Sequence, residues 1–471
     1  MFLKFRPAAL LSRSALAFVL GVAAPMMFAP ANAVKEKKPA ADAGPPKVAV
    51  SKAFLPSAQA MMKAIDDGKK KPEVTAAMTS LETAIAAYNA SSGAAARKAA
   101  NAQIDAANAQ LGAALATEKG MVDPMFTAAT TPDDKFIAGQ LSAQLGTLSQ
   151  DRVLIRRGYT AMLDSGKYPV ADTPKLMNAI GDTCYDMKDY ACAQSYLGKA
   201  IDGGVMNASI GARLGDSYFK ANQVPQGLDV LWKAIQARKA SGQPVPAEWY
   251  GTGLNAAFRA KLLDRASAYS LAMVQDYPTT DNWASAINAV RYLANYEPQE
   301  RMDLLRIMVA TGSFKEGSDY VEFIQTADKL RLPAEELAAV QAGLASGKLQ
   351  ANDVFVTEAR SVSTKQIAEE KPTLAAIETK AKGPAATAIS IAATADALLS
   401  YGMPDRAEAL YALAMQKGGV DAQRLTTRIG IAQFQQGKYA DAQATFAKVT
   451  GTRQPMAAVW AALSASKAKG G

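Results

Sequence analysis

The sequence predicts an all-α protein made of stacked helix hairpins, and three observations lead to this fold class. The chain of 471 residues is 49% hydrophobic and only 7% aromatic, and alanine, the strongest helix former, is prominent throughout. Apolar residues recur at helical spacing, as in Asp189–Ile201, where Ala193 and Leu197 share one face. Strand signals are nearly absent, because the short apolar run Asp353–Val356 stands alone.

Residues 1–33 have the features of an export signal. Basic residues precede the apolar run Ala15–Ala24, and Ala31–Ala33 is typical of a signal-peptide cleavage site. We therefore expect cleavage near Ala33 and an exported, periplasmic protein whose mature chain has no membrane span. A membrane anchor is the weaker alternative, because Pro25 interrupts the apolar run. Residues 34–50 are rich in proline and lysine and predict a disordered linker.

A helix hairpin recurs along the chain with a period of 34 residues. Each copy carries a large aliphatic residue and a glycine in its first helix, and a large apolar residue in its second helix. Small residues let the two helices approach closely, and we expect the large residues to fill the space toward the next hairpin. The clearest copies are Lys175–Ile201 with Ile180, Gly181 and Leu197, Ala212–Ile235 with Leu214, Gly215 and Leu231, and Arg428–Val449 with Ile429, Gly430 and Phe446.

This pattern resembles the tetratricopeptide repeat, whose unit of 34 residues carries L-G-x2-Y in one helix and A-x3-F in the next. The resemblance implies a right-handed solenoid of stacked hairpins, because one hairpin cannot bury its apolar face alone. We expect N-terminal hairpins over 51–130, a solenoid over 131–348, an irregular helical joint over 349–383, and C-terminal repeats with a capping helix over 384–471.

The composition excludes several classes of enzyme. The chain has no histidine, so it can form no Ser-His-Asp triad, no His-ligated zinc site and no haem with a proximal histidine. The acids of the repeats fall at helix-surface spacing beside lysines, as solvated side chains do. We therefore expect neither a cofactor nor catalytic residues. The net charge, +9 for the whole chain, is dispersed, which does not favour nucleic-acid binding.

The only two cysteines, Cys184 and Cys192, flank the turn of one hairpin. An exported chain meets an oxidising compartment in which disulfides persist. A disulfide would join the two helices here, and two buried small apolar residues are the equal alternative, because the geometry between the helices decides. A catalytic thiol is not expected, since no histidine is present to activate it.

In the tetratricopeptide family, the first helix of each hairpin lines a concave face that binds peptides. The resemblance places aromatic, charged and amide side chains of this chain on that face, a mixture suited to peptide binding. The alternative is that the aromatic residues pack against adjacent hairpins. The predicted partner-binding residues are Lys175, Asn178, Asp182, Tyr185, Ser209, Asp216, Phe219, Trp249, Arg259, Arg424 and Phe434.

The resemblance and the composition together predict an exported, non-enzymatic scaffold that binds a protein or a peptide and no nucleic acid. Two alternatives stay open. One is a component of an envelope polysaccharide or secretion export complex. The other is a peptidoglycan-acting enzyme inside a shell of helical repeats, which would need a compact segment with a glutamate in an apolar cleft. The sequence determines neither the partner nor the oligomeric state.

Overall fold

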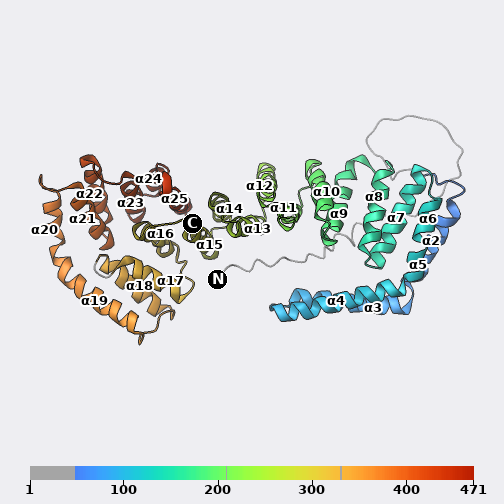
Figure 1. Ribbon diagram of the computed structural model, residues 1–471, viewed down its shortest axis with the longest axis horizontal. Coiled ribbons are helices and arrows are strands. Elements are labelled where there is room, and N and C mark those ends of the chain that lie inside the picture. The colour runs from blue at the N-terminus through green and yellow to red at the C-terminus, as the bar shows by residue number, and fades with distance from the viewer. Residues whose placement is uncertain (1–47, 208, 329–330, 471) are drawn as a thin grey trace. The chain divides into compact units, whose positions relative to one another are not determined.

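The computed structural model describes residues 48–207, 209–328 and 331–470. Within these ranges every regular element is an α-helix or a short 3-10 helix, so the predicted all-α fold class is correct (Figure 1). The predicted signal peptide and most of the predicted linker lie outside the described residues. The chain divides between Pro244 and Val245 into two compact units, called here the N-terminal unit and the C-terminal unit.

The N-terminal unit ends in three hairpins of the repeated type, which are α7 with α8, α9 with α10, and α11 with α12. Its helices are α2 (Leu55–Lys69), α3 (Pro72–Ala90), α4 (Ala94–Ala114), α5 (Ala116–Gly120), α6 (Val122–Ala128), α7 (Pro132–Leu148), α8 (Arg152–Asp164), η1 (Val170–Asp172), α9 (Thr173–Asp186), α10 (Tyr190–Asp202), α11 (Ile210–Lys220) and α12 (Val224–Ala240).

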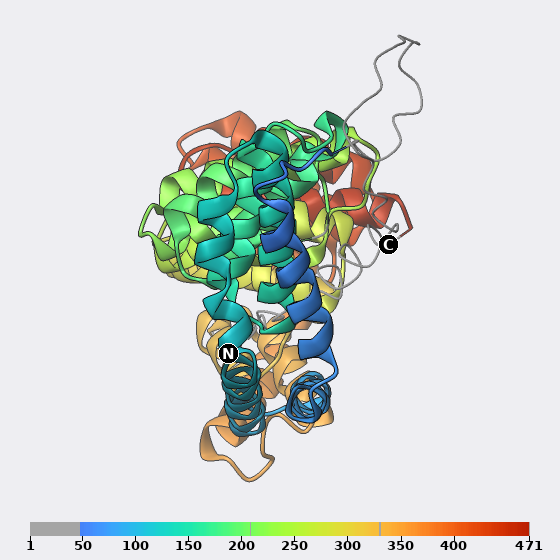
Figure 2. The ribbon, with the colours of Figure 1, turned by 90° about the vertical axis from the view of Figure 1, so that its right-hand side faces the viewer.

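Helices α3 and α4 form a hairpin of their own, seen nearly end-on in Figure 2. Its seam alternates alanine with larger apolar side chains, a pattern that lets two helices pack closely. At its base, Lys71 Nζ lies 2.8 Å from Glu118 Oε1 and donates to the Ala114 carbonyl at 2.9 Å. The buried seam residues are Val74, Ala77, Leu81 and Ala84 on α3, and Ala100, Ile104, Ala107 and Leu111 on α4.

The C-terminal unit continues the hairpins and ends in the helix that the sequence predicts as a cap. The predicted joint over 349–383 is also helical, in two pieces that a 3-10 turn links. The helices are α13 (Ala247–Arg259), α14 (Leu263–Asp276), α15 (Thr280–Leu293), α16 (Pro298–Thr311), α17 (Gly317–Ala327), α18 (Pro333–Ala345), α19 (Val354–Glu370), η2 (Lys371–Thr373), α20 (Leu374–Ala381), α21 (Ala388–Ser400), α22 (Pro404–Lys417), α23 (Ala422–Gln435), α24 (Tyr439–Phe446), η3 (Gly451–Arg453) and α25 (Gln454–Ala468).

Glycines in the first helices let the paired helices approach closely, as predicted. A Cβ atom at Gly181 would lie 2.7 Å from Leu197 Cδ2, and one at Gly430 would lie 2.6 Å from Phe446 Cε1. Leu197 and Phe446 therefore fill space within their own hairpins, a contact that the prediction of packing toward the next hairpin did not include. Phe446 also stacks on Trp460 of the following helix, with ring centroids 5.6 Å apart.

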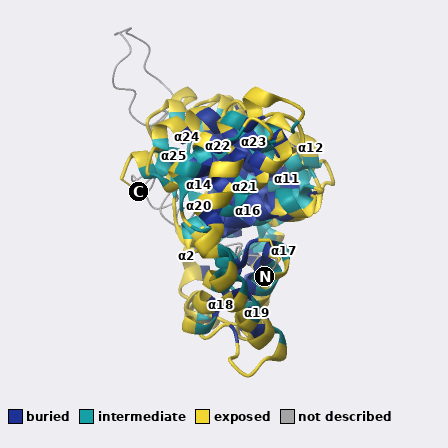
Figure 3. Ribbon diagram, turned by 90° about the vertical axis from the view of Figure 1, so that its left-hand side faces the viewer, coloured by how far each residue is buried: buried dark blue, intermediate teal, exposed yellow. Residues whose placement is uncertain are grey.

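Helix α16 lies at the centre of the C-terminal unit. Every residue from Met302 to Met308 is buried, so the helix is enclosed on all sides over two turns (Figure 3). It contacts α23 and α25, which come more than 100 residues later in the chain. Helices from before and after residue 383 thus belong to one unit, whose first helix follows Pro244.

Candidate functional site

Tyr185 and Asp216 join the first helices of two neighbouring hairpins. The Tyr185 hydroxyl on α9 donates to Asp216 Oδ2 on α11 at 2.5 Å. In the other direction, Arg213 Nη1 on α11 lies 2.9 Å from Asp182 Oδ1 on α9. The Arg213 guanidinium also stands over the Tyr185 ring, 5.6 Å from its centroid. The structure therefore brings three predicted site residues together and adds Arg213 to them.

Asn178 and Lys175 extend this group toward the start of α9. Asn178 Nδ2 donates to Asp182 Oδ2 at 3.2 Å, and Asn178 Oδ1 accepts from Asn207 Nδ2 at 3.3 Å. Lys175 is exposed, with its Nζ 2.8 Å from Asp172 Oδ1. We call the following six residues the first-helix row: Lys175, Asn178, Asp182, Tyr185, Arg213 and Asp216.

Helical spacing explains why these side chains share a face. Asn178, Asp182 and Tyr185 follow one another at intervals of four and three residues, which stacks them along one side of α9. The opposite side of α9 carries the buried Ile180. Gly181 follows Asn178 by three residues and precedes Tyr185 by four, so it lies beside the row, where it packs against Leu197 on the second helix of the hairpin. The polar row therefore runs beside the close contact between the two helices of this hairpin.

The row holds one carboxyl, that of Asp182, in an environment that disfavours its charge. Burial raises the pKa of the Asp182 carboxyl, and the nearby Arg213 guanidinium opposes this rise only in part. Burial and the hydrogen bond to Asp216 both raise the pKa of the Tyr185 phenol, which stays protonated at neutral pH. The Tyr185 hydroxyl donates its one hydrogen to Asp216, which fixes the phenol in place and leaves its oxygen as an acceptor.

Four other predicted residues do not join this row. Ser209 is half-buried at the N-terminus of α11, and Arg259 is exposed at the end of α13 in the C-terminal unit. Phe219 packs inside its own hairpin, because a Cβ atom at Gly227 would lie 2.5 Å from Phe219 Cε1. Trp249 has 0% of its surface exposed, so a partner has no access to it and it is removed from the candidate contacts.

Arg424 and Phe434 make contacts within the C-terminal unit. Arg424 Nη1 donates to Gln299 Oε1 on α16 at 2.8 Å. The Phe434 ring lies edge-on to Trp460 at 5.1 Å and close to Tyr439 at 5.2 Å. Both residues thus face other helices of their own unit, and the alternative of packing between hairpins describes them better than partner contact.

A buried ionic cluster on α16 escaped the sequence analysis. Asp303 is fully buried, and the guanidinium groups of three arginines surround its carboxylate. Arg306 Nη1 lies 2.6 Å, Arg453 Nη1 2.9 Å and Arg428 Nε 3.2 Å from an oxygen of Asp303. No local pattern reveals these contacts, because 125 and 150 residues separate Asp303 from two of its partners.

A recurring ion pair could have been found in the sequence. Arg213 and Arg428 each directly precede the aliphatic-glycine pair of a repeat. Each pairs with an aspartate on the first helix of the preceding hairpin, at 2.9 Å to Asp182 and 2.7 Å to Asp396. Because both aspartates directly follow the small residue at the glycine position of their own repeat, the pairing follows the repeat register.

The two cysteines are joined in the structure. A disulfide links Cys184 near the end of α9 to Cys192 in the first turn of α10, with Cα atoms 5.7 Å apart. Asp189 caps α10 by accepting from the Cys192 backbone N–H at 3.2 Å. Cys184 precedes Tyr185, so the disulfide fixes the end of α9 that carries the row.

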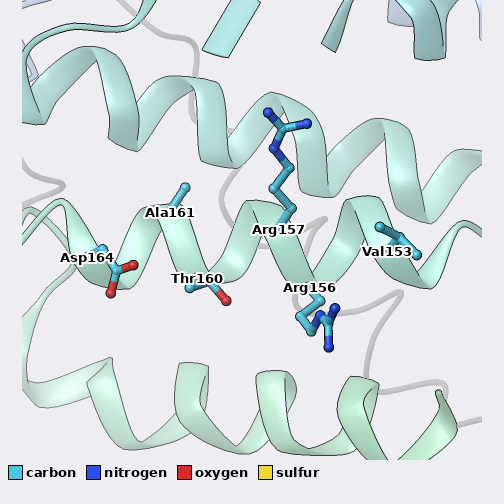
Figure 4. A pocket seen from close by; sticks show the side chains of 6 residues that line it. All are labelled: Val153, Arg156, Arg157, Thr160, Ala161 and Asp164. Carbon is cyan, nitrogen blue, oxygen red and sulfur yellow. The ribbon is translucent and has the colours of Figure 1, made fainter. Parts of the chain in front are cut away.

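A shallow depression of about 490 Å³ lies on α8. Figure 4 shows Arg156 and Arg157 extending from this helix in opposite directions. Arg156 Nη1 lies 2.9 Å from Asp189 Oδ2, and Arg157 pairs with Asp123 and covers the Phe126 ring at 4.1 Å. The lining residues are Val153, Arg156, Arg157, Thr160, Ala161 and Asp164.

Over the described ranges, no group of three or more acidic or cysteine side chains is arranged to hold a metal ion. None of the helices between residues 48 and 470 combines the length and hydrophobicity needed to cross a bilayer.

Comparisons with known proteins find similarity only in structure. No model of a known protein family matches the chain, and no curated protein sequence matches it. One similar structure is the pentatricopeptide repeat protein PPR10 in complex with an 18-nt psaJ RNA element, at 15% identity and a TM-score of 0.28. That alignment covers 83% of this chain and 63% of PPR10, so the chain spans less than two thirds of that protein.

Two further structures have comparable scores. Naa15/Naa10 bound to HypK-THB matches at 11% identity and a TM-score of 0.23, over 85% of this chain and 69% of that one. The human IFIT1 dimer with PPP-AAAA matches at 10% identity and a TM-score of 0.21. That alignment covers 85% of this chain and 95% of the IFIT1 chain. TM-scores this low support no argument about the protein. Its own stacked helix hairpins define it as an α-helical repeat protein.

Proposed function

We propose that this protein is an exported, non-enzymatic scaffold that binds a protein or peptide partner through the first-helix row. The observation that carries the proposal is the inter-repeat contact of Tyr185 with Asp216, beside that of Arg213 with Asp182. These contacts hold half-buried polar groups in fixed positions across two hairpins. Such groups bind with a small entropic cost, because they need no further ordering.

The chemistry of the row favours a polypeptide over a nucleic acid. An extended peptide presents amide donors and acceptors, which the Asn178 amide and the Asp182 and Asp216 carboxylates can meet. A phosphate backbone would instead need a basic face. The row has as many carboxylates as cations, because Asp182 and Asp216 offset Lys175 and Arg213.

Export rests on the sequence of residues 1–33, and the disulfide between Cys184 and Cys192 is in keeping with it. The absence of histidine from the whole chain supports a role without catalysis, since the commonest acid-base side chain is missing. We therefore propose that the protein acts in an oxidising compartment and that its role there is binding.

Affinity capture from an envelope extract tests this function. The bait is the mature protein, compared with the double variant Asn178→Ala and Tyr185→Ala after circular dichroism shows both to be folded. A matched control is Ser195→Ala, an exposed position on the second helix of the same hairpin. A polypeptide retained by the wild type and the control but lost by the double variant supports the proposal. Equal capture by all three contradicts the assignment of the row.

A further inference from the structure

Helix α16 lies against the C-terminal array, the name used here for residues 388–468 from α21 to α25. In Figure 1, α23 and α25 lie beside α16. Side chains on one side of the first turns of α16 reach the array, and they belong to Gln299, Glu300 and Asp303. Two of these side chains are carboxylates and one is an amide. The segment that the array holds is therefore a helix that is acidic on this side.

The array meets this side of α16 with hydrogen-bond donors. Arg424 Nη1 on α23 donates to Gln299 Oε1 at 2.8 Å, and Thr452 Oγ1 on η3 donates to Glu300 Oε1 at 3.0 Å. Asp303 receives the other donors through its carboxylate and its backbone carbonyl. Donors that converge from three separate elements suit a ligand that offers acceptors, and carboxylates above all. These donors, called here the basic socket, belong to Arg424, Arg428, Thr452, Arg453 and Trp460.

Helix α16 leaves part of the basic socket unsatisfied. The Nε atoms of Arg424 and Arg453 are buried and have no hydrogen-bond acceptor among the described residues. Glu300 Oε1 lies 3.6 Å from Arg453 Nε, which is too long for a hydrogen bond. Gln299 offers Arg424 one amide oxygen, whereas a carboxylate has two oxygens and can accept from a guanidinium Nε and Nη together. Because a buried donor without an acceptor costs free energy, a ligand with a carboxylate in the place of Gln299 would fit the socket better than α16 does.

The connections of the C-terminal array allow it to move as a body. Each of its helices packs on the next one along the chain. Residues 382–387, which include Gly383 and Pro384, join the array to α20 and lie outside any helix. A movement at this segment would separate α23 and α25 from α14, α15 and α16 without breaking a helix. It would also return to water the charges around Asp303, which lose their solvation in the closed unit.

We infer that the basic socket binds an acidic helix of a protein partner, and that α16 occupies the socket within the same chain as an autoinhibitory contact. A ligand can open the unit only if it binds the socket better than α16 does. The partner helix therefore carries carboxylates at the three positions that Gln299, Glu300 and Asp303 hold on α16. The inference goes beyond the proposed function, because it assigns a second binding surface and the condition under which this surface becomes available.

Competition between a peptide and α16 tests this inference in the mature chain. The probe is a fluorescein-labelled peptide of residues 297–312 that carries Gln299→Glu, and fluorescence anisotropy measures its affinity. A neutral control peptide keeps Gln299 and carries Glu300→Gln and Asp303→Asn. This control has the same apolar residues as the probe, so it reports binding that does not depend on the carboxylates.

Two substitutions in α16 of the chain should change the affinity for the probe in opposite directions. Glu300→Gln removes the charge that faces Arg453 but keeps the capping box, because glutamine serves at that position as well. Gln299→Glu gives α16 the carboxylate that the probe carries. The matched control chain is Asp281→Asn, at an exposed position of the same unit. Since Gln299→Glu strengthens the closed unit, a loss of folding cannot account for its effect.

The probe should bind Glu300→Gln about ten-fold more tightly than the wild type, because the contact within the chain is weakened. It should bind Gln299→Glu about three-fold more weakly, and Asp281→Asn with unchanged affinity. Addition of Arg424→Gln to Glu300→Gln should remove the gain. A gain that survives this addition overturns the assignment of the socket, and equal binding by Glu300→Gln and the wild type overturns the role of α16. The absence of binding, or equal binding of the control peptide, overturns both.

Double electron-electron resonance follows the opening itself. Spin labels are attached at Ser318→Cys on α17 and at Gln443→Cys on α24, exposed positions of which one precedes the array and one lies within it. The two native cysteines form a disulfide and take no label. Addition of the probe to Glu300→Gln should lengthen the distance between the labels. A distance that stays the same while the probe is bound overturns the displacement of α16.

Discussion

Asp303 and Arg453 lie 2.9 Å apart although 150 residues separate them in the chain. Asp303 has no exposed surface, and it contacts Arg306 and Arg428 as well. The indole N–H of Trp460 donates to its backbone carbonyl at 2.9 Å. These contacts tie α16 to the last helices of the C-terminal unit, so a solenoid that could stay open is closed upon itself. Arg424 and Phe434, two predicted partner-binding residues of this unit, are engaged in contacts with its own helices. The first-helix row of the N-terminal unit is therefore the better candidate for a binding surface.

Replacing Asp303 should destabilise the C-terminal unit strongly. Asp303→Asn leaves three buried arginines without their shared carboxylate, and removal of one partner from a buried ion cluster costs about 3–5 kcal/mol. Denaturant unfolding followed by circular dichroism measures the change. The matched control is Asp281→Asn, which removes an exposed partner of Lys315 and should cost about 1 kcal/mol or less. Similar losses in the two variants would contradict the role given to the cluster.

Acid should weaken the C-terminal unit through the same residue. Burial favours the neutral form of Asp303, but the three arginines outweigh it and hold the pKa of this carboxyl below its ordinary value. Its contribution to stability is therefore complete above the unfolded-state pKa of about 3.9, and it is lost as the pH falls through the lower folded-state value. Unfolding free energies measured from neutral pH to below pH 4 should fall less steeply for Asp303→Asn than for the wild type. Parallel curves would show that other carboxyls carry the acid sensitivity.

The disulfide should stabilise the N-terminal unit to a moderate extent. Cys184 and Cys192 are eight residues apart, and closing so short a loop contributes about 2–3 kcal/mol through the entropy of the unfolded chain. Reduction with dithiothreitol should lower the free energy of unfolding by this amount. The variant with both cysteines changed to alanine serves as the control, because the reductant should leave it unchanged. A reductant effect of equal size on that variant would remove the disulfide as the cause.

Two glycines of one hairpin should respond to alanine in opposite ways. Gly181→Ala places a Cβ atom 2.9 Å from the Leu197 backbone nitrogen, and such overpacking costs about 1–3 kcal/mol. Gly198→Ala on α10 meets no atom within 4 Å, so the gain in helix propensity should stabilise by about 0.5–1 kcal/mol. Thermal unfolding of the two variants compares them directly. Destabilisation by Gly198→Ala would be at odds with the open space at that position.

The hairpins could be predicted from the sequence because their signals are local. A period of 34 residues and the small residues that let paired helices approach, such as Gly181, both follow from spacing along one stretch of chain. The closure of the C-terminal unit could not, because Asp303 and Arg428 are 125 residues apart and no pattern links them.

The candidate site shows the same limit. The repeat register assigns two aromatic residues, Tyr185 and Trp249, to the concave face. Tyr185 is half-exposed and hydrogen-bonded to the next hairpin, whereas Trp249 is fully buried. The register fixes which helix carries a side chain, but burial depends on the neighbouring helices. Arg213 stands outside the consensus positions of the repeat, although it repeats in register with Arg428.

The most direct measurement of the central claim is the affinity of the captured partner for purified wild-type protein and for Tyr185→Ala. Loss of a buried contact at a binding hot spot should weaken binding by a factor of about ten or more, which corresponds to about 1.4 kcal/mol. Ser195→Ala should bind as the wild type does. If Tyr185→Ala is folded and binds with unchanged affinity, the first-helix row is not the binding surface and the proposed function loses its structural basis.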